Sequence, residues 1–125
     1  KLPKDNSKLY IYDTLGELGE IYEMCEYVIM GGSFVNKGGH NPIEPAKFRT
    51  AIFSGSHYFN FENEYEGLIE SKAAKIFKDK INIDILKNKS EIHKMALNAE
   101  NYSISLGGVS DLIIKEIEML MKKNA

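Results

Sequence analysis

The sequence predicts an α/β fold in which helices flank a parallel sheet. Three observations indicate this class: short apolar runs bounded by turn residues, helical patterns between these runs, and glycine-rich segments that follow them. Continuous apolar runs are typical of strands that are covered on both faces, as in parallel sheets. The alternation of such strands with helices then favours a sheet joined by crossover connections.

Four runs are predicted to be strands, and helical patterns lie between them. The strands are expected at Leu9–Tyr12, Tyr27–Met30, Ala51–Phe53 and Ala74–Phe77. One helical face is formed by Leu15, Leu18, Tyr22 and Cys25, and another by Phe61, Tyr65, Leu68 and Ile69. Both sets follow the spacing of an amphipathic helix, so their apolar residues are expected to face the sheet.

The last third of the chain is predicted to be helical. Helical spacing with an N-cap at Ser90 is expected for Ile92, Met95, Ala96, Ala99 and Tyr102. The pair Gly107 and Gly108 then precedes a final helix that carries Leu112, Ile113, Ile117, Leu120 and Met121 and ends in a basic turn. We therefore expect one α/β domain over residues 1–125, with a helical tail over about 90–125.

Composition excludes several classes of protein. The 125 residues are 43% hydrophobic and 27% charged, which excludes a disordered tail, a collagen-like repeat and a disulfide-stapled miniprotein. Sixteen Lys and Arg against 18 Asp and Glu leave a charge of −2, with no basic stripe for nucleic acid.

Cys25 has no partner for an internal disulfide and fits a reducing compartment. No apolar run reaches the roughly 18 residues of a membrane span. Since the chain opens on Lys1, we interpret it as a piece of a longer protein.

The segment Gly31–Pro45 is the richest in chemical features. Gly31 and Gly32 permit a sharp turn after a strand, and Gly38 and Gly39 leave room for a ligand near the backbone. Asn41–Glu44 has the composition of a helix start, whose free amides and dipole favour a phosphate. A plain capping box would explain Asn41 and Glu44 equally well, and both interpretations stay open. The spacing differs from the common dinucleotide fingerprint.

Two further segments follow predicted strands. In Asp13–Leu18, a capping box accounts for Thr14 and Glu17, whereas Gly16 costs a helix about 1 kcal/mol relative to alanine and favours a ligand nearby. In Ser54–Phe61, His57 is a candidate phosphate or sugar-acid contact, although a histidine in a polar loop is more often simply solvated or hydrogen-bonded. Ligands of open α/β sheets bind at the carboxyl ends of strands, where all three segments are expected.

Other chemistry is not indicated. His93 is expected on a helix surface, and no His, Cys or acidic pair has metal-ligand spacing. Ser33 and Ser54 have no histidine partner that would make either a nucleophile.

These three segments closely resemble the 3-deoxy-D-manno-octulosonic acid (Kdo) transferases of lipopolysaccharide synthesis. That family shows the patterns D-T-x-G-E-L, G-G-S-x-V-x-x-G-G-H-N-x-x-E-P and G-P-H-x-x-N-F in this order. Here they are Asp13–Leu18, Gly31–Pro45 and Gly55–Phe61. The resemblance covers about residues 9–77, and the long middle pattern is the most specific.

The resemblance implies a glycosyltransferase of GT-B architecture, of which this chain is most of the Rossmann-like C-terminal domain. The implied donor is CMP-Kdo and the implied acceptor is a lipid A precursor, without metal or cofactor. By similarity, CMP contacts fall on Leu15, Gly16, Glu17, Asn41, Pro42, Ile43 and Glu44, with Glu44 accepting hydrogen bonds from ribose hydroxyls. The acidic catalytic base belongs to the family's N-terminal domain, so this chain is expected to hold no catalytic residue and to be inactive alone. The whole protein is expected on the cytoplasmic face of the bacterial inner membrane, attached through its N-terminal part, and this piece is expected to be soluble.

Some positions depart from the family pattern. Arg49-Thr50-Ala51 stands where the family usually has Gly-Lys-Pro, and Ser56 replaces the proline before His57. A Pro-Arg pair that holds CMP in the family is expected upstream of Lys1.

Two alternative functions remain: another GT-B sugar-nucleotide enzyme, such as a UDP-sugar transferase or epimerase, and a non-catalytic α/β nucleotide-binding module. The sequence does not determine how many Kdo residues are transferred, or the oligomeric state.

Overall fold

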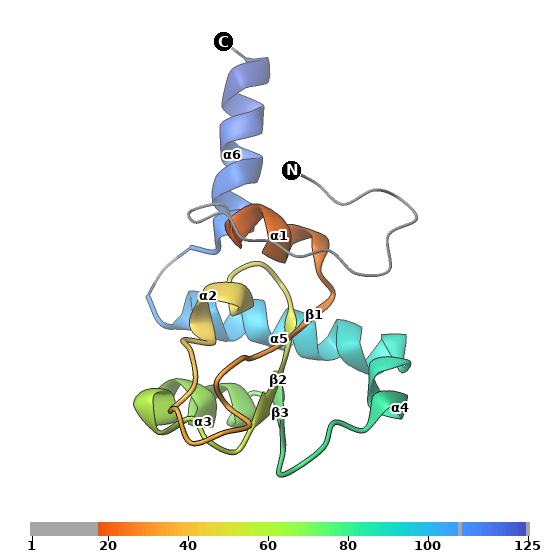
Figure 1. Ribbon diagram of the computed structural model, residues 1–125. Coiled ribbons are helices and arrows are strands. Elements are labelled where there is room, and N and C mark those ends of the chain that lie inside the picture. Colours follow the sequence, from red (N-terminus) through yellow and green to blue (C-terminus); the bar gives the residue numbers. More distant parts are fainter. Residues whose placement is uncertain (1–17, 108, 125) are drawn as a thin grey trace.

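The structure is a computed structural model that describes residues 18–107 and 109–124 (Figure 1). The predicted strand Leu9–Tyr12 and the segment up to Glu17 therefore lie outside the described residues. The elements in chain order are α1 (Leu18–Met24), β1 (Tyr27–Ile29), α2 (Ile43–Ala46), β2 (Ala51–Gly55), a 3-10 turn η1 (Phe59–Phe61), α3 (Glu62–Glu70), β3 (Ala74–Phe77), α4 (Ile83–Leu86), α5 (Lys89–Ser105) and α6 (Asp111–Lys123).

The three described strands form one parallel sheet in the order β1-β2-β3. Val28 lies opposite Ile52, and Ser54 lies opposite Ile76. All five residues of β2 are buried, as expected for the central strand of a sheet that is covered on both faces. The predicted α/β class and the parallel arrangement are confirmed for these strands.

Alternate side chains of the strands enter two separate parts of the core. On one face, Val28, Ile52, Ala74 and Ile76 belong to a cluster with residues of α2 and α3. On the other face, Tyr27, Ala51, Phe53 and Phe77 pack with residues of α4 and of the first half of α5. This division follows from the two-residue period of a strand, which sends successive side chains to opposite faces.

Three local predictions were wrong in detail. α5 begins at Lys89, and its N-cap is Asn88, whose side-chain oxygen accepts a hydrogen bond from the Glu91 amide at 3.2 Å, so Ser90 is not the cap. Ile69 is 37% exposed although Leu68 is fully buried, because neighbouring residues lie about 100° apart on a helix and a nine-residue helix buries a narrow stripe. Cys25 lies just beyond α1 and is only half-buried.

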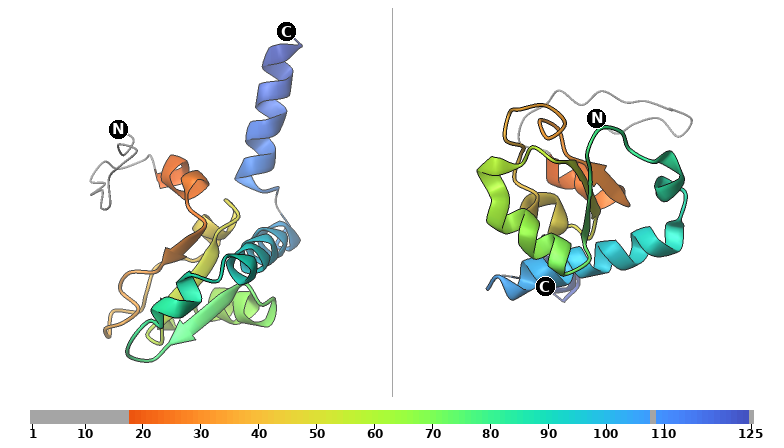
Figure 2. Two further views of the ribbon diagram at one scale, coloured as in Figure 1. Left: turned by 90° about the vertical axis from the view of Figure 1, so that its right-hand side faces the viewer. Right: turned by 90° about the horizontal axis from the view of Figure 1, so that it is seen from below.

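The helix α6 extends away from the sheet (Figures 1 and 2). Ser110 caps it by accepting a hydrogen bond from the Ile113 amide at 3.2 Å, and its last turn carries Lys122 and Lys123, as predicted. None of its residues is buried, and an ion pair of 2.8 Å between Lys115 and Glu23 links it to α1. Among the described helices, none combines the length and the hydropathy that crossing a membrane would need.

One ion pair joins the corner before β2 to the middle of α5. Arg49 donates from Nε at 3.0 Å and from Nη2 at 2.9 Å to the same oxygen, Oε1, of Glu100. Arg49 has a φ of 55°, a left-handed conformation that costs an L-residue roughly 1–2 kcal/mol. Glu100 is 5% exposed, and its Oε2 has no hydrogen-bond partner within the described residues. The ion pair therefore compensates for both a strained backbone and a buried charge.

Candidate functional site

The loops that follow β1 and β2 lie side by side at the carboxyl edge of the sheet. The backbone amide of His57 donates to the carbonyl of Ser33 at 2.8 Å, and the amide of Asn60 donates to the carbonyl of Gly38 at 3.1 Å. We call residues 31–40 the first loop and residues 55–60 the second loop. Two of the three segments singled out in the sequence are thus brought together at the edge where parallel sheets bind ligands.

The glycines of the first loop are required by the protein itself. Gly38 and Gly39 have φ values of 89° and 78°, which favour glycine. A Cβ at Gly39 would lie 3.3 Å from the carbonyl oxygen of His57 and 3.3 Å from the Cα of Tyr58. The expectation that these glycines leave space for a ligand was therefore wrong: the space is filled by the second loop.

The prediction that Asn41 is the N-cap of the next helix was wrong by one residue: the N-cap is Pro42, and this helix, α2, is only one turn long. The Asn41 Oδ1 accepts a hydrogen bond from the Ile43 amide at 3.0 Å just before the helix, and α2 ends at Ala46. Pro42 and Pro45 have no N–H, the Ile43 amide donates to Asn41, and the Ala46 amide donates to the Pro42 carbonyl. In this turn, the Glu44 amide is therefore the one that could donate to a ligand. The free amides expected here for a phosphate are thus reduced to one.

The Glu44 side chain is exposed and makes no hydrogen bond within the described part of the chain. The structure therefore gives no support to the second half of a capping box at this position. Burial raises the pKa of the Tyr22 hydroxyl, and the nearby Glu44 carboxylate and Cys25 raise it further. The Glu44 carboxylate is thus close to α1 and available to a hydroxyl-bearing ligand.

A hollow of about 360 Å³ runs along β1 up to the first loop. It is lined by Tyr22, Cys25, Tyr27, Val28, Ile29, Met30, Gly31 and His40. The rings of Tyr22 and Phe48 lie 5.9 Å apart, which places α1 beside the segment that follows α2. The candidate site residues Leu15, Gly16 and Glu17 lie outside the described residues, directly before α1.

Two residues hold the first loop in place in a way that was not predicted from the sequence. The Ser33 hydroxyl donates to the Met30 carbonyl at 2.6 Å and accepts from the Gly55 amide at 2.8 Å, so its role is structural and not that of a nucleophile. The Tyr65 hydroxyl donates to the His40 carbonyl at 3.2 Å. A serine directly after two glycines at a strand end is the one local signal that pointed to Ser33.

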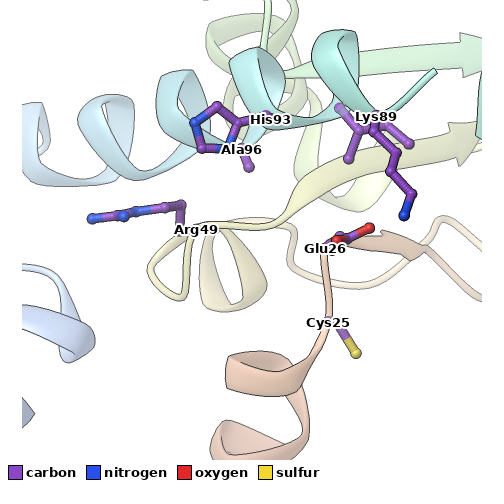
Figure 3. A pocket seen from close by; sticks show the side chains of 7 residues that line it. Cys25, Glu26, Arg49, Lys89, His93 and Ala96 are labelled. Atoms are coloured by element: carbon purple, nitrogen blue, oxygen red, sulfur yellow. The ribbon is translucent and has the colours of Figure 1, made fainter.

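A second hollow lies at the opposite, amino edge of the strands (Figure 3). Its lining consists of Cys25, Glu26, Arg49, Lys89, Ile92, His93 and Ala96. In Figure 3 the Lys89 side chain extends toward Glu26, whereas the Arg49 guanidinium points away from both. The volume of about 130 Å³ is small beside the roughly 300–1,000 Å³ of sites that bind organic ligands. This hollow is therefore a poor candidate for a nucleotide site.

The described residues do not form a metal site. Within residues 18–107 and 109–124, no group of three or more His, Cys, Asp or Glu side chains is arranged to hold a metal ion.

Comparisons with known proteins connect the chain to one family. The 3-deoxy-D-manno-octulosonic acid transferase of Rickettsia prowazekii is 34% identical over 124 residues, which are 98% of this chain and 25% of that protein. The transferase of the same name from Haemophilus influenzae is 39% identical over 70 residues, which are 56% of this chain and 16% of that protein. No protein-family model matches. The chain thus spans a quarter or less of the length of these relatives.

A solved structure shows the same fold. The crystal structure of the C-terminal CMP-Kdo binding domain of WaaA from Acinetobacter baumannii aligns with a TM-score of 0.65 and 28% identity. The alignment covers 73% of this chain and 50% of that chain.

Proposed function

Because the chain belongs to the 3-deoxy-D-manno-octulosonic acid transferase family, we propose that it is the donor-binding part of a glycosyltransferase that uses CMP-Kdo. The similarity to a solved CMP-Kdo binding domain is the observation that carries this proposal. The pairing of the first and second loops at the carboxyl edge of the sheet agrees with it, since α/β folds bind nucleotides at this edge.

Within this function, Glu44 accepts hydrogen bonds from the ribose hydroxyls of CMP. Its carboxylate is exposed and without a hydrogen-bond partner in the described part of the chain, which leaves both oxygens for a ligand. Asn41, Pro42 and Ile43 form the adjoining wall, and the hydrogen bond from the Ile43 amide to the Asn41 side chain fixes the direction of the turn. Leu15, Gly16 and Glu17 provide the other CMP segment in this proposal.

The rest of the reaction is assigned to the parent protein. We place the catalytic base and the binding of a lipid A precursor on an N-terminal domain, in a GT-B enzyme at the cytoplasmic face of the bacterial inner membrane. This chain then supplies no catalytic residue, and the proposal needs neither a metal nor a cofactor.

The isolated 125-residue chain is expected to be catalytically inactive and to bind CMP only in the millimolar range. In this proposal the cleft is closed by two domains, and an upstream arginine contacts the phosphate. Loss of one charged phosphate contact costs on the order of 2 kcal/mol, or about thirtyfold in affinity. An assay with CMP-Kdo and a lipid A precursor should show no transfer by the chain alone.

Calorimetry with CMP and UMP tests the donor class in the same preparation. CMP should bind more tightly than UMP if the donor is CMP-Kdo. Equal binding of UMP would instead favour a UDP-sugar enzyme, and transfer by the chain alone would overturn the assignment of the catalytic base to another domain.

A further inference from the structure

Ser33 joins the two loops of the candidate site through two hydrogen bonds and is tied to the end of β1 by a third. Its hydroxyl donates to the Met30 carbonyl at 2.6 Å and accepts from the Gly55 amide at 2.8 Å. Its own carbonyl accepts from the His57 amide at 2.8 Å. The residue is fully buried, so water does not compete for these bonds.

These bonds extend the connection between β1 and β2 beyond the last ladder bond. That ladder bond runs from the Met30 amide to the Phe53 carbonyl at 2.8 Å. Gly55 has no room for a side chain, because a Cβ there would overlap the carbonyl of Ser33. The side chain of Ser33 therefore bridges the strand ends by bonding to the Met30 carbonyl on one side and to the Gly55 amide on the other.

A short series of hydrogen bonds and covalent links connects Ser33 with Asn41. The Gly39 amide donates to the Gly32 carbonyl at 3.1 Å, so the first loop closes on the residue beside Ser33. His40 follows directly, and its carbonyl accepts from the Tyr65 hydroxyl at 3.2 Å. Burial raises the pKa of the Tyr65 hydroxyl, which therefore keeps the proton that it donates.

We propose that Ser33 is a positioning residue for donor binding: its buried hydroxyl fixes the first loop against the second loop and so places Asn41–Glu44 for the nucleotide. The inference rests on the proposed function and deepens it. A hydroxyl suits this role because one group both donates and accepts. Alanine at this position would leave the Gly55 amide and the Met30 carbonyl buried without this partner.

The kinetic test compares Ser33→Ala with Ser103→Ala in the full-length transferase that contains this chain. Ser103 is also a buried serine, but its hydroxyl donates at 2.7 Å to the backbone carbonyl of Glu100 within α5. Ser33→Ala should raise the KM for CMP-Kdo about tenfold and leave kcat within about twofold, whereas Ser103→Ala should change neither. Ser33→Cys keeps a weak donor and acceptor and should give an intermediate KM.

Hydrogen exchange provides a readout that does not depend on the ligand. In the 125-residue chain without nucleotide, Ser33→Ala should speed exchange of the Gly55 and His57 amides about tenfold, and Ser103→Ala should leave them unchanged. Unchanged exchange at these amides, or an unchanged KM for CMP-Kdo, would overturn the proposal. If the unsubstituted transferase does not use CMP-Kdo although the exchange effect is present, the proposed function fails, and the donor role of Ser33 fails with it.

Discussion

Replacement of Arg49 with alanine is expected to lower the free energy of unfolding by about 3 kcal/mol. Breaking a buried ion pair by removing one partner costs about 3–5 kcal/mol, and the lower end applies because the Arg49 side chain is 46% exposed. Alanine keeps the strained φ of 55° without the ion pair that compensates for it. Since small domains are stable by only about 5–15 kcal/mol, urea denaturation should show a large shift of the midpoint.

Two further variants separate the causes of this loss. Arg49→Gly removes the backbone strain and should be more stable than Arg49→Ala by roughly 1 kcal/mol. Adding Glu100→Gln to Arg49→Ala removes the unpaired buried charge and should restore part of the stability. A loss below about 0.5 kcal/mol for Arg49→Ala would mean that the pair acts like an ordinary surface ion pair, contrary to its geometry.

Replacement of Glu44 with glutamine is expected to weaken donor binding by the full-length transferase about 10- to 150-fold. A hydrogen bond to a charged group contributes roughly 1.5–3 kcal/mol to binding, and glutamine lacks the negative charge of the Glu44 carboxylate that strengthens the bonds to the ribose hydroxyls. The fold should be unaffected, because the Glu44 side chain is exposed and forms no hydrogen bond in the described residues. Donor affinity and melting temperature should therefore be measured on the same samples.

Glu70→Gln is a suitable control for the change of charge. Glu70 is also exposed, and it lies at the end of α3, where the chain leads into the amino end of β3. It should change neither quantity. Unchanged donor affinity together with a large fall in melting temperature for Glu44→Gln would show that Glu44 serves only the helix start.

The strands could be predicted from the sequence because their signal is local. Tyr27–Ile29, Ala51–Gly55 and Ala74–Phe77 all contain the short apolar runs expected of a covered parallel sheet. The start of α2 could be predicted to within one residue, since Asn41 and Pro42 are good residues for a helix start, although the N-cap is Pro42. Its length could not be predicted, because a start signal does not say how many turns the packing permits.

The contacts that hold the site together could not be predicted, because they join distant parts of the chain. Ser33 meets Gly55 across 22 residues, and Arg49 meets Glu100 across 51 residues. The glycines of the first loop show the same limit. Their pattern indicated a close approach, but only the structure reveals that Tyr58 of the second loop makes this approach to Gly39.

The most direct test of the central claim is an NMR titration of the ¹⁵N-labelled chain with CMP, since this method detects millimolar binding. The expected result is that the shifted amides are those of residues 15–17 and 31–44, including Ile43 and Glu44, and that UMP at the same concentration gives smaller shifts. The proposal would be contradicted by shifts clustered around Lys89 and His93 at the amino edge of the sheet, or by equal shifts with UMP.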